Sequence, residues 1–162
     1  IWRGQHLQSL LTHMFMHCGV LHLVGNMYFL FVTGDDVEDR FGWHWFPGFY
    51  LLCGLAAALT HLAFNPRSDV PCVGASGAVA GVIGAYVVLF PKNRFLFRWF
   101  YFLWYHVSFE WPAVAYFVVW ILLQGLLAVL DVPGVAWWAH IGGFVFGAGL
   151  ALAVQRFGRR KE

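Results

Sequence analysis

Charged side chains are scarce in this chain of 162 residues. Asp, Glu, Lys and Arg make up 11% of it, whereas apolar residues make up 60% and the mean hydropathy is +0.66. A soluble domain carries roughly 25% charged residues, and a core of this length cannot hide so much apolar surface from water. The composition therefore excludes a water-soluble globular protein and predicts an integral membrane protein.

Several other features are absent, and each absence narrows the choice of function. The three cysteines, Cys18, Cys53 and Cys72, show no Cys-x-x-Cys spacing, so we expect buried small side chains rather than a metal site or a disulfide framework. The formal net charge is only +2, and no basic stripe indicates a nucleic-acid interface. No signal-peptide pattern follows Ile1, and we expect a fragment or a trimmed chain.

Five segments are long and apolar enough to cross roughly 30 Å of hydrocarbon as helices. They lie at Leu10–Thr33, Phe46–Phe64, Val73–Phe90, Ala113–Leu130 and Val135–Val154. None shows the strict alternation of a membrane β-strand. Between the third and fourth, Phe95–Trp111 is dense in aromatic residues, which is typical of a connector at the membrane interface. The sequence predicts one all-α domain, a polytopic transmembrane helical bundle.

The distribution of basic residues predicts the orientation of these helices. If the segments alternate in direction, one side receives only Arg3 and Arg67. The other side receives eight basic residues: Arg40, Lys92, Arg94, Arg98, Arg156, Arg159, Arg160 and Lys161. By the positive-inside rule the basic side is cytoplasmic, and its tail is expected to touch anionic lipid. His22, Ser76 and His140 then all fall in the outer halves of their helices.

Polar side chains at one depth of a membrane are costly and indicate a functional site. Serine becomes a nucleophile when a base such as histidine takes its proton. No Asp or Glu lies in the spans near the outer end, so we expect a dyad of Ser76 and His140. The backbone N–H of Ser76, together with His22 and Asn26 at positions i and i+4, could stabilise an oxyanion.

Other interpretations of the same residues remain open. Ser76 alone could be a small packing residue, and His22 and Asn26 could simply hydrogen-bond between helices. His13 and His17 have the i, i+4 spacing of some metal ligands, but no glutamate follows His13 and no second histidine cluster is present. A metal-dependent membrane oxidase would need such clusters on the cytoplasmic side.

Small residues recur every fourth position around both members of the dyad. This spacing lets membrane helices approach closely, and it would bring Ser76 near His140. The glycines expected to pack helices together are Gly74, Gly77, Gly81, Gly143 and Gly147.

The motifs, taken in order along the chain, resemble those of the rhomboid intramembrane serine proteases. They are His17-Cys-Gly-Val-Leu-His22-Leu-Val-Gly-Asn26, Gly34-x-x-x-Glu38 in the following loop, Gly74-Ala-Ser76-Gly77 and Ala139-His140-x-x-Gly143-x-x-x-Gly147. The resemblance covers nearly the whole chain. It departs at Ala80, where some members place a tyrosine that packs on the catalytic histidine.

The resemblance implies a function and a more complete fold. It implies a six-helix core, so that residues 1–162 form a rhomboid-like membrane domain lacking the first transmembrane helix. It implies Ser76 as nucleophile, His140 as base, and an oxyanion site formed by the Ser76 N–H, His22 and Asn26. The helix Ala113–Leu130 and the loop to Val135 would act as a movable gate.

The expected activity is serine endopeptidase cleavage of transmembrane protein substrates in the lipid bilayer, without metal or cofactor and without nucleic acid. We expect a bacterial inner membrane, with the site facing outside. The alternative is a catalytically silent rhomboid-like protein that binds membrane helices.

Overall fold

The computed structural model describes residues 8–66, 73–102 and 105–158. Some residues used in the sequence predictions therefore lie outside the described part. These are Ile1, Arg3, Arg67, Cys72, Arg159, Arg160 and Lys161.

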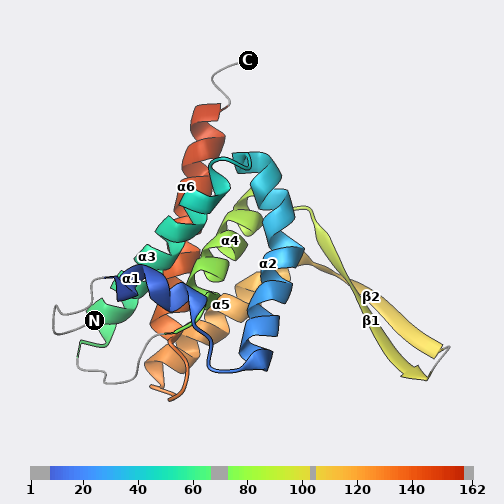
Figure 1. Cartoon of the computed structure of the whole chain (residues 1–162). Helices are drawn as coiled ribbons and strands as arrows, with labels where there is room; N and C mark the ends of the chain where they lie inside the picture. The colour runs from blue at the N-terminus through green and yellow to red at the C-terminus, as the bar shows by residue number, and fades with distance from the viewer. Residues whose placement is uncertain (1–7, 67–72, 103–104, 159–162) are drawn as a thin grey trace.

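The chain forms a predominantly helical bundle, as predicted (Figure 1). In chain order the helical elements are α1 (Ser9–Thr12), a 3-10 turn η1 (His13–Phe15), α2 (Val20–Phe41), α3 (Phe46–Phe64), α4 (Ser76–Leu89), α5 (Ala113–Val129) and α6 (Trp137–Gly158). The bounds of α3 are those predicted from hydropathy. Helix α5 begins at the predicted residue. The other ends of α4, α5 and α6 differ from the predictions by one to four residues.

The prediction of one continuous helix over Leu10–Thr33 is wrong. The segment Ser9–Phe15 meets α2 at a bend of 94°, because Met16 is extended and ends the 3-10 turn. Helix α2 then continues to Phe41, so Gly34 and Glu38 lie on it and not in a loop. It stops at Gly42, whose φ of +86° suits a glycine at a helix C-terminus.

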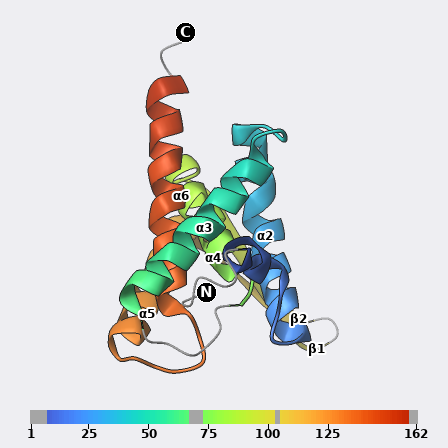
Figure 2. The same ribbon diagram turned by 60° about the vertical axis from the view of Figure 1, so that its left-hand side comes forward.

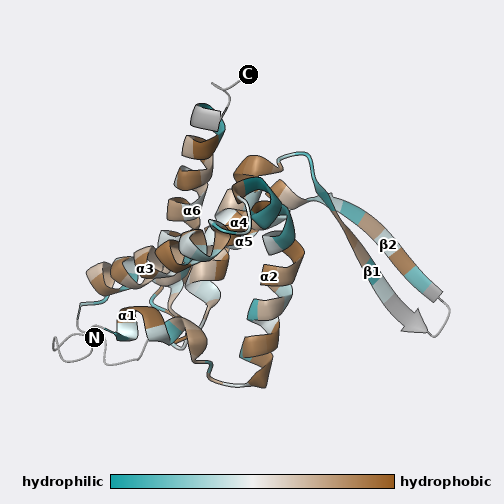
Figure 3. Ribbon diagram, turned by 45° about the horizontal axis from the view of Figure 1, so that its top comes forward, coloured by the Kyte–Doolittle hydropathy of each residue, from teal (hydrophilic) through white to brown (hydrophobic). Residues whose placement is uncertain are grey.

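The aromatic connector is a β-hairpin. Strands β1 (Arg94–Phe102) and β2 (Tyr105–Pro112) pair antiparallel and project away from the helices (Figures 1 and 3). Because neighbouring side chains on a strand point to opposite faces, one face of the hairpin carries mainly aromatic residues. This aromatic face comprises Phe95, Phe97, Trp99, Phe109 and Trp111, together with Val107. Its base packs on α5, where Tyr116 and Phe117 contact Phe95.

The C-terminal ends of α2, α4 and α6 lie at one end of the bundle (Figure 1). Two side-chain hydrogen bonds join them there. Gln155 Nε2 donates to the carbonyl of Val88 at 3.1 Å, and Asn93 Nδ2 donates to Asp36 Oδ2 at 3.3 Å. Of the described basic residues in the predicted cluster, Arg40, Lys92 and Arg156 belong to this end, whereas Arg94 and Arg98 belong to the hairpin that leaves it.

The bundle carries its apolar side chains on the outside as well as inside. Leu21 is 88% exposed and Phe31 81% exposed, and apolar residues cover most of the helices (Figure 3). By length and hydropathy, α3 and residues Trp137–Arg156 of α6 can each span a membrane. The segment Ser9–Phe15 and α2, taken together as one bent span, are a third candidate. Helices α4 and α5 are shorter apolar helices. The chain is therefore a membrane-embedded helical domain.

Helix α4 lies in the middle, among α2, α3, α5 and α6 (Figures 1 and 2). It has 14 residues, which makes it about 21 Å long. That is shorter than the roughly 30 Å of hydrocarbon in a bilayer. All of its residues from Gly77 to Tyr86 are buried, so neighbouring helices shield it from lipid.

Glycines bring the backbones of α4 and α6 into contact, as the four-residue spacing predicted. A Cβ added at Gly143 would collide with the carbonyl oxygen of Gly77, and one added at Gly147 would collide with that of Gly81. Gly84, which the sequence analysis did not single out, faces the Phe144 carbonyl in the same way. The separation of these two helices is thus set by main-chain atoms.

Candidate active site

Ser76 and His140 meet at the end of the bundle opposite the basic end. Ser76 is the first residue of α4, and His140 lies in the first turn of α6. The Ser76 Oγ and the His140 Nε2 are 2.8 Å apart. The imidazole is 8% exposed and Ser76 is half-buried. The structure therefore brings together the two residues of the expected dyad, with the hydroxyl able to donate to Nε2.

The other ring nitrogen of His140 contacts a residue that the sequence analysis missed. Gln124 on α5 places Oε1 at 2.7 Å from His140 Nδ1, and Gln124 itself is only 5% exposed. Only Asp or Glu was expected as an orienting group for the histidine. The available signal was a single amide within an otherwise apolar span, which is costly unless it has a partner.

Two tryptophans flank the imidazole. The Trp120 ring lies with its centroid 5.8 Å away at an interplanar angle of 31°, and the Trp137 ring lies edge-on at 6.3 Å. Trp137 is itself held because its Nε1 donates to the carbonyl of Val132 at 2.6 Å. These contacts, together with Gln124, hold the imidazole of His140 in place.

His22 and Asn26 lie on the first two turns of α2 and face the segment that leads into α4. Asn26 is 7% exposed, and its Nδ2 is a buried donor with no hydrogen-bond partner within the described residues. A Cβ added at Gly74 would lie 2.7 Å from His22 Cε1 and 3.7 Å from Asn26 Nδ2. Both predicted donors are therefore close to the backbone two residues before Ser76.

Gly74 is not a helix-packing glycine, contrary to the prediction. It precedes α4 and has a φ of +118°, a conformation that favours glycine. Its N–H donates to the carbonyl of His13 at 2.9 Å. Gly74 therefore lets the loop turn close to α2 and presents Ser76 beside His22.

His13 and His17 show no arrangement of metal ligands within the described part of the chain. His17 packs edge-on against His22 with ring centroids 5.2 Å apart, and His13 Nδ1 lies 3.1 Å from the carbonyl oxygen of Ser9. Among the residues with described positions, no group of three His, Cys, Asp or Glu could hold a metal ion.

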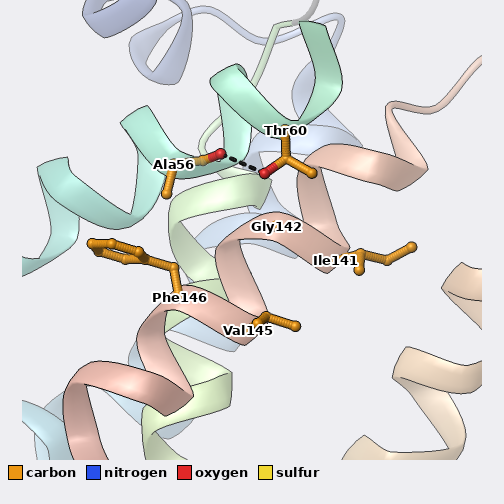
Figure 4. Close-up of a pocket in the computed structure, with 6 residues that line it drawn as sticks. All are labelled: Ala56, Thr60, Ile141, Gly142, Val145 and Phe146. Atoms are coloured by element: carbon orange, nitrogen blue, oxygen red, sulfur yellow. Dashed lines mark hydrogen bonds between the residues drawn. The ribbon is translucent and has the colours of Figure 1, made fainter. Parts of the chain in front are cut away.

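An apolar groove between α3 and α6 does not belong to this site (Figure 4). Its lining includes Thr60, Gly142 and Val145, and the Thr60 hydroxyl donates within α3 to the carbonyl of Ala56 at 2.8 Å. Since a helix turns about 100° per residue, Gly142 and Val145 face away from the side of α6 that carries His140.

Comparison with known proteins identifies the family. The family model described as the Rhomboid domain matches residues 2–157. The chain belongs to the rhomboid family. Among its relatives, RHOMBOID-like protein 7 of Arabidopsis thaliana is 30% identical over 147 residues, which is 91% of this chain and 41% of that protein. The chain thus spans about two fifths of the length of this rhomboid relative.

The rhomboid relatives include proteins with and without a named protease activity. Rhomboid protease GluP of Bacillus subtilis is 35% identical over 88 residues, covering 54% of this chain and 17% of that protein. Inactive rhomboid protein 1 of Rattus norvegicus is 30% identical over 142 residues, covering 86% of this chain and 15% of that protein. The relatives come from a plant, a bacterium and a mammal, so kinship does not assign this rhomboid chain to a bacterial inner membrane.

Proposed function

We propose that this rhomboid chain is the core of an intramembrane serine endopeptidase, with Ser76 as nucleophile and His140 as general base. The observation that supports this most is the 2.8 Å contact between Ser76 Oγ and His140 Nε2. A serine and a histidine in hydrogen-bond contact, with a third group on the far nitrogen of the histidine, form the arrangement that activates a hydroxyl.

The chemistry follows from these positions. As Oγ attacks the scissile carbonyl carbon, the serine proton passes to Nε2 and the carbonyl oxygen gains the negative charge. Donors for that oxyanion are the Ser76 N–H, which has no partner within α4 because it begins the helix, and the side chains of His22 and Asn26. The protonated Nε2 then gives its proton to the departing amine. Water attacks the resulting acyl-enzyme with His140 again accepting a proton, and Ser76 is regenerated.

The length of α4 supports a site below the membrane surface. If the Leu89 end of α4 lies near the basic face, Ser76 lies about 10 Å short of the opposite face. A transmembrane helix hides its carbonyls in internal hydrogen bonds, so the substrate segment must unwind locally to present one to Ser76. By the positive-inside rule the site faces outside, and a bacterial inner membrane is the proposed location.

The second candidate function is binding of membrane helices without cleavage. It is favoured by the similarity to a protein named inactive. This chain nevertheless keeps a serine and a histidine in contact, and a binding protein has no need of that pair.

A fluorophosphonate probe, which reacts covalently with activated serines, tests the proposal in reconstituted vesicles. We expect labelling of the wild type that both Ser76→Ala and His140→Ala abolish. Ser108→Ala is the matched control, because Ser108 is an exposed serine on the hairpin, and it should leave labelling unchanged. Absence of labelling in the folded wild type would support the binding function instead.

A further inference from the structure

Gln124 is a buried amide whose two polar atoms have different partners. Its Oε1 lies 2.7 Å from His140 Nδ1, and its Nε2 donates to the carbonyl of Trp120, one turn earlier on α5, at 3.4 Å. We infer that Gln124 is a positioning residue that fixes which ring nitrogen of His140 carries the proton. This inference rests on the proposed function, because it concerns the base of the same reaction.

The amide can satisfy both contacts in one orientation only. If it were flipped, Oε1 would face the Trp120 carbonyl oxygen, and two acceptors would repel each other. The helix backbone of α5 therefore keeps Oε1 towards the imidazole. Since an amide oxygen only accepts, His140 Nδ1 must carry the hydrogen that it receives.

The position of this hydrogen decides whether the dyad can act. With the proton on Nδ1, Nε2 has a free lone pair directed at the Ser76 hydroxyl, 2.8 Å away. With the proton on Nε2, the ring would donate to Ser76 Oγ and could not accept its proton. Gln124 thus stabilises the tautomer that accepts from Ser76, as an orienting carboxylate does in serine proteases of other folds.

The arrangement also joins two helices. Gln124 and the neighbouring Trp120 ring belong to α5, whereas His140 belongs to α6. The correct tautomer is therefore favoured only while the outer part of α5 lies against α6. Displacement of α5 would leave His140 Nδ1 without the acceptor that holds its hydrogen in place.

Two substitutions at Gln124 and one at Gln155 distinguish a role in positioning His140 from a role in stabilising the fold. Gln124→Leu removes the acceptor, whereas Gln124→Glu keeps an acceptor oxygen at the same distance along the side chain. Gln155→Leu is the matched control, because Gln155 also bonds between helices, to the Val88 carbonyl, but at the opposite end of the bundle. Turnover of a model transmembrane peptide and fluorophosphonate labelling are measured for all three.

We expect Gln124→Leu to lower kcat about tenfold to a hundredfold with little change in KM. These factors correspond to about 1.4–2.8 kcal/mol, within the usual loss when a buried donor is left unsatisfied. Gln124→Glu should retain more activity than Gln124→Leu, because an acceptor oxygen still faces Nδ1, and Gln155→Leu should keep wild-type kcat. An unchanged kcat in Gln124→Leu, or an equal loss in Gln155→Leu, would overturn the positioning role.

Nitrogen NMR of protein labelled at histidine gives a readout that does not depend on turnover. The His140 signals are those that disappear in His140→Ala. The wild type should show a hydrogen on Nδ1, and Gln124→Leu should shift the population towards the Nε2 tautomer. An identical tautomer in both would contradict the inference even if kcat falls. A tautomer shift in a protein whose serine never reacts would instead support the role of Gln124 and refute the protease.

Discussion

Substituting Gly143 by alanine should separate α4 from α6 at the level of the dyad. The added Cβ would collide with the carbonyl oxygen of Gly77, the residue after Ser76, and this is main chain that cannot rotate away. Relief of the collision requires about 1 Å of separation. The distance between Ser76 Oγ and His140 Nε2 would then grow from 2.8 Å to about 3.8 Å, beyond hydrogen-bond range.

A displacement of about 1 Å costs roughly a hundredfold in rate, or about 2.7 kcal/mol of transition-state stabilisation. Crowding of this kind also lowers the free energy of unfolding by about 1–3 kcal/mol. The assay is the labelling rate with the fluorophosphonate probe, measured beside thermal unfolding of the same sample. Both values should fall for Gly143→Ala.

The control is Gly149→Ala on the same helix. A Cβ at Gly149 would meet nothing within 4 Å, and alanine favours a helix over glycine by about 0.5–1 kcal/mol. This variant should be fully reactive and as stable as the wild type or slightly more so. If Gly143→Ala reacts at the wild-type rate, the argument that backbone contact sets the geometry of the dyad is refuted.

Two further substitutions test the donor side of the site. Asn26→Ala should lower peptide turnover by up to a hundred- to a thousandfold without abolishing it, since one oxyanion donor is worth about that much; turnover that is unaffected would remove Asn26 from the reaction. Gly74→Ala should destabilise the fold by about 1–3 kcal/mol, because its φ of +118° is strained for alanine, and should also slow labelling by displacing His22. Thermal unfolding and labelling measure both effects, and wild-type values in both would contradict the close approach of this loop to α2.

The helices were predictable because hydropathy carries their signal. Phe46–Phe64 was located to the residue, since a continuous apolar run bounded by polar or turn residues has clear ends. The break before α2 was not predictable, because Met16, His17 and Cys18 are as compatible with a helix as their neighbours. The β-hairpin was missed as strands because its aromatic density suggested an interface, although the strict alternation of polar and apolar residues over His106–Trp111 has the period of a strand.

The residues of the candidate site were predictable, but the contacts and backbone turns that hold them in place were not. Ser76, His140, His22 and Asn26 stood out because polar groups are rare in the spans. The partner of His140 depended on how α5 lies against α6, which no spacing within α5 reveals. Gly74 was grouped with the packing glycines because its neighbours in the sequence pack, whereas its backbone dihedral gives it a different role.

The hairpin on α5 has a mechanical consequence. Helix α5 is contacted near its start, where Tyr116 and Phe117 touch the aromatic face of the hairpin, and two turns later, where Gln124 touches His140. Strands of this length extend about 30 Å, so the hairpin is a long arm attached to the start of α5. If the aromatic face lies among lipid headgroups, as Trp and Tyr at a membrane interface do, the level of the membrane surface on that side sets the position of the hairpin relative to α5. A change in membrane thickness on the side of the hairpin would then be transmitted through α5 to Gln124, which contacts His140.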